Sequence, residues 1–172
     1  MGAVISPFAG SSAPAGPAGG ALQGTYPNPV LAAAAPLSAQ PADPAGTIST
    51  TLVMMGLAVQ YTPARSGLVQ VSAQCYCNTT TNVTNMTVGP RFGTGAPPAN
   101  GVAVTGTRFG SDVDPTGHCG VVGIDVCYAF NAILALAAGT TYWFDFALAT
   151  AIAADQANMT GVSMSLVELP VT

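Results

Sequence analysis

The ten residues from Leu68 to Cys77 alternate with a period of two along the chain. Because successive side chains of a β-strand point to opposite faces, this period predicts a strand with a buried face and a wetter face. The expected buried face carries Val69, Val71, Ala73, Cys75 and Cys77, and the wetter face carries Leu68, Gln70, Ser72, Gln74 and Tyr76. A strand of this kind must cover one face with a second layer, so the segment predicts a sheet packed on a core.

Further segments of β-type sequence follow, with turn-type sequences between them. The expected strands span residues 52–61, 82–92, 102–109, 121–130, 140–148 and 162–169. Residues 133–138 fit either a helical turn or a continuation of the preceding strand, and segments 63–67, 93–101 and 112–117 have the Gly and Pro content of turns and loops. Seven or eight evenly spaced strands predict an all-β fold, a single antiparallel β-sandwich of jelly-roll type.

Residues 1–46 differ in composition from the rest of the chain. They hold eight of the fourteen prolines and seven glycines, a mixture that cannot bury enough apolar surface to fold alone. We therefore expect an extended N-terminal arm over residues 1–46 and a β-sandwich domain over residues 47–172. The arm residues expected to grip a partner, or the arm's own domain, are Val4, Ile5, Phe8, Leu22, Tyr26, Pro27, Pro29 and Leu31.

The segment from Gly19 to Val30, GGALQGTYPNPV, is where we expect the arm to be held. Pro27 and Pro29 fix φ near about −65° and remove two N–H donors, so the segment fits neither a helix nor a central strand. Tyr26 is the only aromatic residue between Phe8 and Tyr61, which favours a groove-binding strap. A flexible linker that carries a tyrosine is the alternative.

Charged residues make up only 6% of the chain, which excludes several classes of partner. There is no lysine, the three arginines are scattered, and the net charge is −4, so phosphate-dominated binding of nucleic acid is excluded. The longest apolar run of the expected domain, residues 126–138, is too short to cross a bilayer and contains Asn131, so no membrane span is expected. The first residues lack the basic and apolar regions of a secretory signal.

Four cysteines and one histidine raise the question of a metal site or a disulfide. Cys75 and Cys77 alternate along one expected strand, a spacing unlike the knuckles of structural zinc sites, so we expect no metal and no other cofactor. A disulfide from this pair to Cys119 or Cys127 is geometrically open, although assembly in a cytoplasm opposes it. The favoured interpretation is that the cysteines are small buried hydrophobic residues.

No catalytic constellation emerges from the sequence. His118 and Cys119 are adjacent, and adjacent strand residues point to opposite faces, so they form a poor catalytic pair and no enzymatic activity is expected. Asp112 and Asp114, with Asp125, raise the question of a calcium ion, but DVDPTG has the wrong spacing for an EF-hand loop. A carboxylate-rich turn is the favoured interpretation there.

Two parts of the chain resemble bacteriophage structural proteins. The motif GG-x-L-x-GTYPNP, at the end of the arm, resembles one that precedes a fibre or β-domain in such proteins. Over residues 50–169, the segments RFGTGAPPANGVAVTGTRFGS, GTTYWFD and VSMSLVEL look like a small β-domain of phage virion proteins. These resemblances imply strand ends and turns at the quoted segments, and no catalysis.

The resemblance implies a non-enzymatic virion component, assembled in the host cytoplasm. We expect a homotrimer that decorates a capsid, with the arm docked on the major capsid protein or another virion protein and the uncharged surface packed around a threefold axis. A tail-fibre or baseplate component is the first alternative. The second is a host-glycan-binding β-module, in which Trp143 and the loop 93–101 would hold the glycan; Trp143 is expected to face solvent or a neighbouring subunit.

Overall fold

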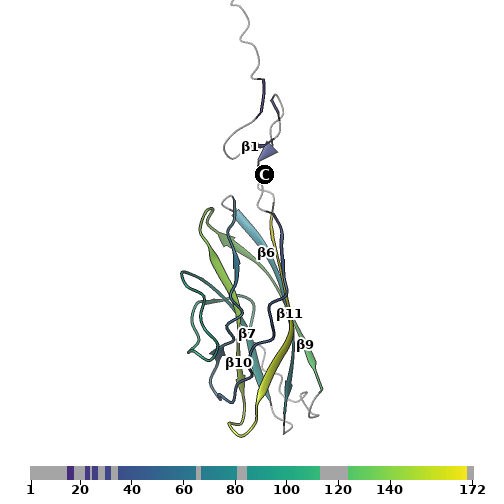
Figure 1. Ribbon diagram of the computed structural model, residues 1–172, viewed down its shortest axis with the longest axis vertical. Coiled ribbons are helices and arrows are strands. Elements are labelled where there is room, and N and C mark those ends of the chain that lie inside the picture. Colours follow the sequence, from purple (N-terminus) through teal and green to yellow (C-terminus); the bar gives the residue numbers. More distant parts are fainter. Residues whose placement is uncertain are drawn as a thin grey trace, which may run out of the picture. The chain divides into compact units, whose positions relative to one another are not determined.

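The chain folds into two compact units, residues 1–33 and residues 34–172 (Figure 1). This computed structural model describes residues 15–17, 22–23, 25–26, 30–31, 35–64, 67–80, 85–112 and 124–169. Within these ranges every regular element is a β-strand and all strand pairs are antiparallel. The second unit is a jelly-roll-like β-sandwich, as the sequence predicts.

Two sheets form the layers of the sandwich (Figure 1). The β6 sheet has the order β3-β11-β6-β9 and consists of β3 (Leu37–Ala39), β6 (Gly67–Thr79), β9 (Val126–Leu136) and β11 (Ala157–Glu168). The β10 sheet has the order β4-β10-β7-β8, with β5 also paired to β10. Its strands are β4 (Val53–Met54), β5 (Val59–Tyr61), β7 (Met86–Thr94), β8 (Thr107–Arg108) and β10 (Tyr142–Thr150).

The core lies between the facing sides of the two sheets. Every second residue of β6 is buried, and the alternate residues of β10 face it with Phe144, Phe146 and Leu148. Phe144 stacks on Phe92 with ring centroids 6.0 Å apart, and Phe146 packs on Phe130 at 5.6 Å. The buried face predicted for Leu68–Cys77 is therefore confirmed: its five members are between 0% and 3% exposed.

Several predicted strand limits change in the structure. The segment 52–61 is interrupted between β4 and β5, and the segment 102–109 contributes only the two residues of β8. Residues 133–136 continue β9 rather than forming a helical turn, because Leu134 and Leu136 keep the period-two placement toward the core. Ile124 precedes β9 and is 53% exposed, so its predicted inward position is wrong.

The sandwich begins earlier than the predicted boundary at residue 47. Leu37–Ala39 form β3, which pairs with Leu166–Met164 of β11 at the edge of the β6 sheet. Thr47 then exchanges two backbone hydrogen bonds with Ala157, of 2.8 and 2.9 Å. Residues 34–46 thus belong to the compact unit, although their proline content resembles that of the arm.

A buried carboxylate holds the interruption between β4 and β5. Both strands pair with the same edge of β10, and the chain between them contains two residues with positive φ, Gly56 and Ala58. Asp145 of β10 is 0% exposed and accepts N–H groups from Gly56 at 2.9 Å, Leu57 at 3.1 Å and Phe146 at 2.7 Å. Its carboxylate replaces the backbone acceptors that a continuous strand would have had.

Burial raises the pKa of Asp145 to about 6, from 3.8, and the three backbone donors only partly oppose this effect. Folding therefore favours the protonated, neutral form of Asp145 over its ionised form. Stability from this group is fully present below the unfolded pKa and is lost as the pH rises through about 6.

We predict that Asp145 makes the unfolding free energy fall by about 2 kcal/mol between pH 4 and pH 6.5, which is most of the total effect of a pKa shift from 3.8 to about 6 at about 1.36 kcal/mol per pKa unit. The measurement is chemical denaturation of the protein and of Asp145→Asn at each pH. The variant is expected to be less stable at low pH by about 1–3 kcal/mol, because its side chain has a single acceptor atom. The gap between the two proteins should then shrink as the pH rises. A gap that stays constant across this window would contradict the assignment.

Candidate interaction surfaces

The described residues of the first unit form a small hairpin around the GTYPNP motif. β1 (Leu22–Gln23) pairs with β2 (Val30–Leu31), with Leu22 opposite Leu31. Tyr26 lies in the connection between these strands, is partly exposed, and donates its N–H to the carbonyl of Gly16 at 3.0 Å. Backbone pairing within the first unit thus joins described residues on both sides of the motif, and docking of this segment as an extended strap stays a prediction.

Of the eight residues predicted to dock the arm, the structure describes three, Leu22, Tyr26 and Leu31. The hairpin brings Leu22 and Leu31 together as cross-strand partners. Val4, Ile5, Phe8, Pro27 and Pro29 lie outside the described residues.

Trp143 is buried beneath the chain's own loop, so its predicted position facing solvent or a neighbouring subunit is wrong. Its side chain is 3% exposed and its Nε1–H donates to the carbonyl of Thr94 at 3.2 Å. Its indole lies against Gly93 and Gly106, where neither glycine has a Cβ to keep it away. It packs with Met54 and Ala147 on the side of the β10 sheet that faces away from the core. An indole covered in this way has no open face on which a sugar could stack.

We predict that Gly106→Ala displaces the indole. An added Cβ would meet the Trp143 ring and would lie 2.5 Å from the carbonyl oxygen of Phe92. Gly95→Ala is the matched control, because Gly95 also has positive φ (84° against 77°) but open space around the added atom. The overpacked variant should be less stable than the control by about 1–3 kcal/mol. Fluorescence of this tryptophan, the only one in the chain, should shift to longer wavelength only in Gly106→Ala.

The cysteines divide between the two faces of the β6 sheet. Cys75 and Cys77 are 0% exposed on the core side, with Sγ atoms 3.9 Å apart, which confirms their interpretation as small buried residues. For Cys127 the same interpretation is wrong: it is exposed and pairs with Tyr76 across the strands, so it lies on the opposite face and cannot bond either of them. His118 and Cys119 lie outside the described residues. Within the described ranges no three His, Cys, Asp or Glu side chains gather as metal ligands.

Asp112 is held by two arginines rather than turned toward a cation. Arg91 donates to both carboxylate oxygens, at 2.7 and 3.1 Å, and Arg108 adds a contact at 3.3 Å. The Arg91 hydrogen bond holds the pKa of Asp112 below its usual value, against the opposing effect of burial. Asp125 accepts from Asn78 at 2.7 Å, on the β6 sheet, so a calcium site combining it with Asp112 is not supported. Asp114 lies outside the described residues.

The side of the β6 sheet that faces away from the core is a broad surface of mostly uncharged side chains. We call it the outer face. Its members are Ser38 of β3; Leu68, Gln70, Ser72, Gln74, Tyr76 and Asn78 of β6; Cys127, Ala129, Asn131, Ile133 and Ala135 of β9; and Asn158, Thr160, Ser163, Ser165 and Val167 of β11. Leu68, Tyr76, Ile133 and Val167 are between 37% and 60% exposed there. None of these members is charged; the nearby charged side chains among the described residues are Asp125 at one end and Asp43 beside β11.

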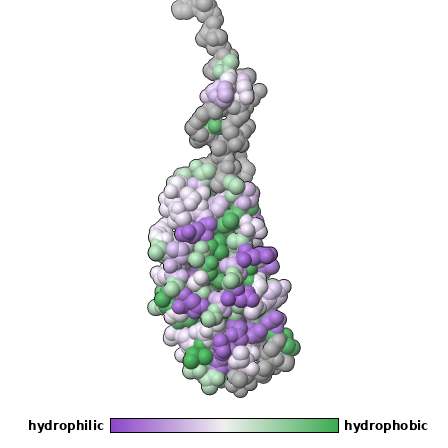
Figure 2. All heavy atoms as spheres, viewed as in Figure 1, coloured by the Kyte–Doolittle hydropathy of each residue, from purple (hydrophilic) through white to green (hydrophobic). Residues whose placement is uncertain are grey.

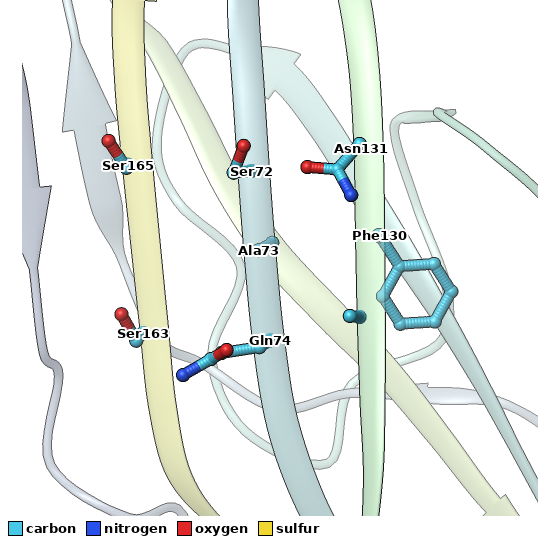
Figure 3. A pocket seen from close by; sticks show the side chains of 8 residues that line it. Ser72, Ala73, Gln74, Phe130, Asn131, Ser163 and Ser165 are labelled. Atoms are coloured by element: carbon cyan, nitrogen blue, oxygen red, sulfur yellow. The ribbon is translucent and has the colours of Figure 1, made fainter.

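Polar side chains occupy the middle of the outer face and surround a shallow hollow of about 240 Å³ (Figure 3). Ser72 and Gln74 of β6 lie between Ser163 and Ser165 of β11 and Asn131 of β9. The amide of Gln74 extends toward Ser163, and that of Asn131 toward Ser72 (Figure 3). A second hollow beside it is lined by Gln74, Ser163 and the segment Gln40–Asp43.

A row of hydrogen bonds closes one end of the outer face. Asn158 donates to Asn78 at 3.0 Å, and Asn78 donates to Asp125 at 2.7 Å, so the row crosses three strands. Nearby, the β-bulge between Thr160 and Ser163 is fixed by Asp43, which accepts the N–H of Gly161 at 2.8 Å. The bulge places Gly161 against the ring of Tyr76.

The wetter side of Leu68–Cys77 was expected from the alternation, but its partners were not. Sequence reasoning gave no strand order, so it could not bring Asn131 and Ser165 beside Ser72. The sequence does contain one indication of this surface, which is the alternation of small polar residues within residues 163–167. Only the pairing of strands determines which face of the sheet those residues occupy.

Figure 2 shows apolar and polar residues interspersed over the visible side of the sandwich. In the described part of the chain, no helix is long and apolar enough to cross a membrane.

Comparison with known proteins gives likeness at the level of fold only. No family model and no curated protein matches the chain. Solved structures of similar shape include Eiger TNF from S. frugiperda, at 13% identity and a TM-score of 0.34 over 66% of each chain. Two others are structures of infectious bursal disease virus. The Gx strain matches at 11% identity and TM-score 0.41, and the Gt strain at 10% and 0.43.

The chain covers 44% and 39% of those two viral chains, while 92% and 95% of its own length is matched. The two-sheet topology, rather than these likenesses, identifies the chain as a jelly-roll-like β-sandwich protein.

Proposed function

We propose that the chain is a non-enzymatic structural protein of a bacteriophage virion, a homotrimer that decorates the capsid and docks through its N-terminal unit. The observation that carries the proposal is the division of the chain into a unit of residues 1–33, which holds the GTYPNP motif, and a second unit that forms the β-sandwich. The motif resembles a sequence that precedes β-domains in phage structural proteins. An N-terminal unit that is compact in itself suits attachment to a second protein.

The hairpin of the first unit offers the chemistry of attachment. Leu22 and Leu31 pair across β1 and β2, and the partly exposed ring of Tyr26 lies in the connection between these strands. Aromatic residues are common anchors in protein interfaces. The partner would be the major capsid protein or another virion protein.

The described acidic groups support a non-enzymatic role. Asp145 caps a strand interruption, Asp112 is paired with Arg91, and Glu168 accepts the N–H of Ala64 at 3.3 Å. Each of these three carboxylates maintains the sandwich. Asp43 lines the second hollow, and there it accepts the N–H of Gly161 at 2.8 Å.

We predict that removing residues 1–33 leaves a folded sandwich that no longer attaches to phage shells. Removal of residues 1–46 should instead destabilise the sandwich, because it deletes β3 and the residues that lead to Thr47. Cosedimentation with shells measures attachment, and thermal unfolding by circular dichroism measures the fold. In the full-length chain, Tyr26→Ala should weaken attachment about tenfold or more, whereas Thr51→Ala, at an exposed site of the sandwich, should not. Attachment that survives removal of residues 1–33 would refute docking through the arm.

A tail-fibre or baseplate component is the alternative that the same motif favours. Quantitative gel analysis of purified particles separates the two, because decoration requires hundreds of copies and a fibre only a few. A low copy number would end the capsid proposal. The glycan-binding alternative loses its predicted site, because the ring of Trp143 is covered by the chain's own loop.

A further inference from the structure

We propose that the outer face of the β6 sheet is the contact surface between copies of this chain. The inference rests on the self-association proposed above and assigns it to one surface. It requires neither the phage origin nor the arm.

The charge distribution favours a second copy as the occupant. Any two copies carry the same net charge of −4, so contact between them is least costly through a surface without charges. Most of the described acidic and basic side chains lie elsewhere: Asp112, Arg91 and Arg108 belong to the region of the β10 sheet, and Asp145, Asp155 and Glu168 are buried. The charged groups next to the outer face are Asp125 at one end and Asp43 beside the bulge of β11, so a contact through the middle of the face leaves no ionised group without water.

The polar groups of the outer face are suited to meeting copies of themselves. The hydroxyl groups of Ser72, Ser163 and Ser165, and the amides of Gln74 and Asn131, each contain both a donor and an acceptor. Such groups can pair with an identical set, whereas a carboxylate or guanidinium would face its own charge. The apolar members lie at the two ends of the face. Leu68, Ile133 and Val167 surround Gln70 at one end, and Tyr76 lies beside Cys127 at the other.

The size of the outer face is comparable to what a stable interface needs. Its three long strands have 11 to 13 residues each, and β3 has three. At about 4.8 Å between strands and about 3.3 Å per residue, they cover roughly 600 Å². Standard interfaces bury about 800 Å² on each partner, so the outer face of one copy could supply most of an interface half.

The opposite sheet does not offer a comparable surface. Its outward side chains Met54, Trp143 and Ala147 are between 0% and 3% exposed, beneath the loop that contains Gly106. The loop also exchanges backbone hydrogen bonds with Met54, at 2.9 Å from its N–H to Val102 and 2.8 Å from Gly101 to its carbonyl. The chain covers one sheet with itself, and in the described residues it leaves the outer face of the other uncovered apart from the segment around Gln40–Asp43.

The first test compares two equally exposed isoleucines by light scattering and sedimentation equilibrium of the full-length chain. Ile133 on the outer face is 60% exposed, and Ile48 outside it is 62% exposed. Ile133→Glu should raise the dissociation constant of the assembly at least tenfold, because it places like charges in the contact. Ile48→Glu should leave it unchanged. Circular dichroism melts establish that both variants are folded.

A second pair of variants changes only charge. Gln70→Glu adds a carboxylate to the outer face, opposite Ile133 and Val167, whereas Gln60→Glu adds one to the exposed side of β5 in the other sheet. The first should weaken assembly about tenfold or more and the second should not. Thiol labelling of Cys127, followed by peptide mass mapping, should be slow in the assembled protein and fast in Gln70→Glu.

Each result tests whether the outer face is the contact between copies. A wild-type assembly that both Ile133→Glu and Gln70→Glu leave intact would overturn the assignment of the outer face, while the proposed trimer would stand. A wild-type chain that is monomeric at micromolar concentration would overturn the assignment too, whereas shell attachment and copy number would still test the virion role separately. If such a monomer binds a host glycan and Gln74→Ala abolishes that binding, the outer face is a glycan-binding site instead.

Discussion

The carboxylate of Asp145 is the contact on which the β10 sheet depends. By accepting N–H groups from Gly56 and Leu57, it lets one edge of β10 pair with two short strands in place of one long strand. At the break, Gly56 approaches the backbone of Asn100 so closely that a Cβ would lie 2.5 Å from its nitrogen. Asn100 in turn donates its side-chain amide to the carbonyl of Met55 at 3.1 Å. The loop that covers Trp143 is thus anchored at the place where the buried acid interrupts the strand.

This arrangement makes the two sides of the sandwich different. In the β10 sheet, a loop covers the outward tryptophan and methionine side chains. The β6 sheet instead exposes small hydroxyl and amide groups on its outer face. With only ten charged residues in the chain, the places where charge does occur become informative. Most of the described ones have a structural partner, such as Arg91 with Asp112 or Asp43 with the backbone of Gly161.

Local alternation was enough to predict the buried face of β6, the inward aromatic residues of β10 and the class of fold, because the period of two reports directly on which face is covered. Alternation failed to predict the structure where a contact with a distant part of the chain acted on the same residues. The segment 52–61 reads as one strand because its apolar residues are continuous, and only the distant carboxylate of Asp145 reveals the break. Trp143 occupies an outward position in an alternating strand, so no local pattern indicates that residues 93–106 return to cover it. Leu37–Ala39 lie among prolines, and their strand exists only because β11 offers an edge.

The pairing of β3 also determines how mechanical load enters the sandwich. Any pull on the arm reaches the domain first through Leu37–Ala39, which are joined to β11 by an antiparallel ladder of three residue pairs. Antiparallel hydrogen bonds lie perpendicular to the strands, so a force along β3 is shared by the whole ladder, whereas a force away from the sheet breaks its bonds one after another. The next attachments along the chain are the hydrogen bond that Asp43 accepts from Gly161, the one that Ala45 accepts from Asn100, and the pair of bonds between Thr47 and Ala157. A pull that separated β3 from β11 would therefore meet these isolated hydrogen bonds in turn before it reached the two packed sheets.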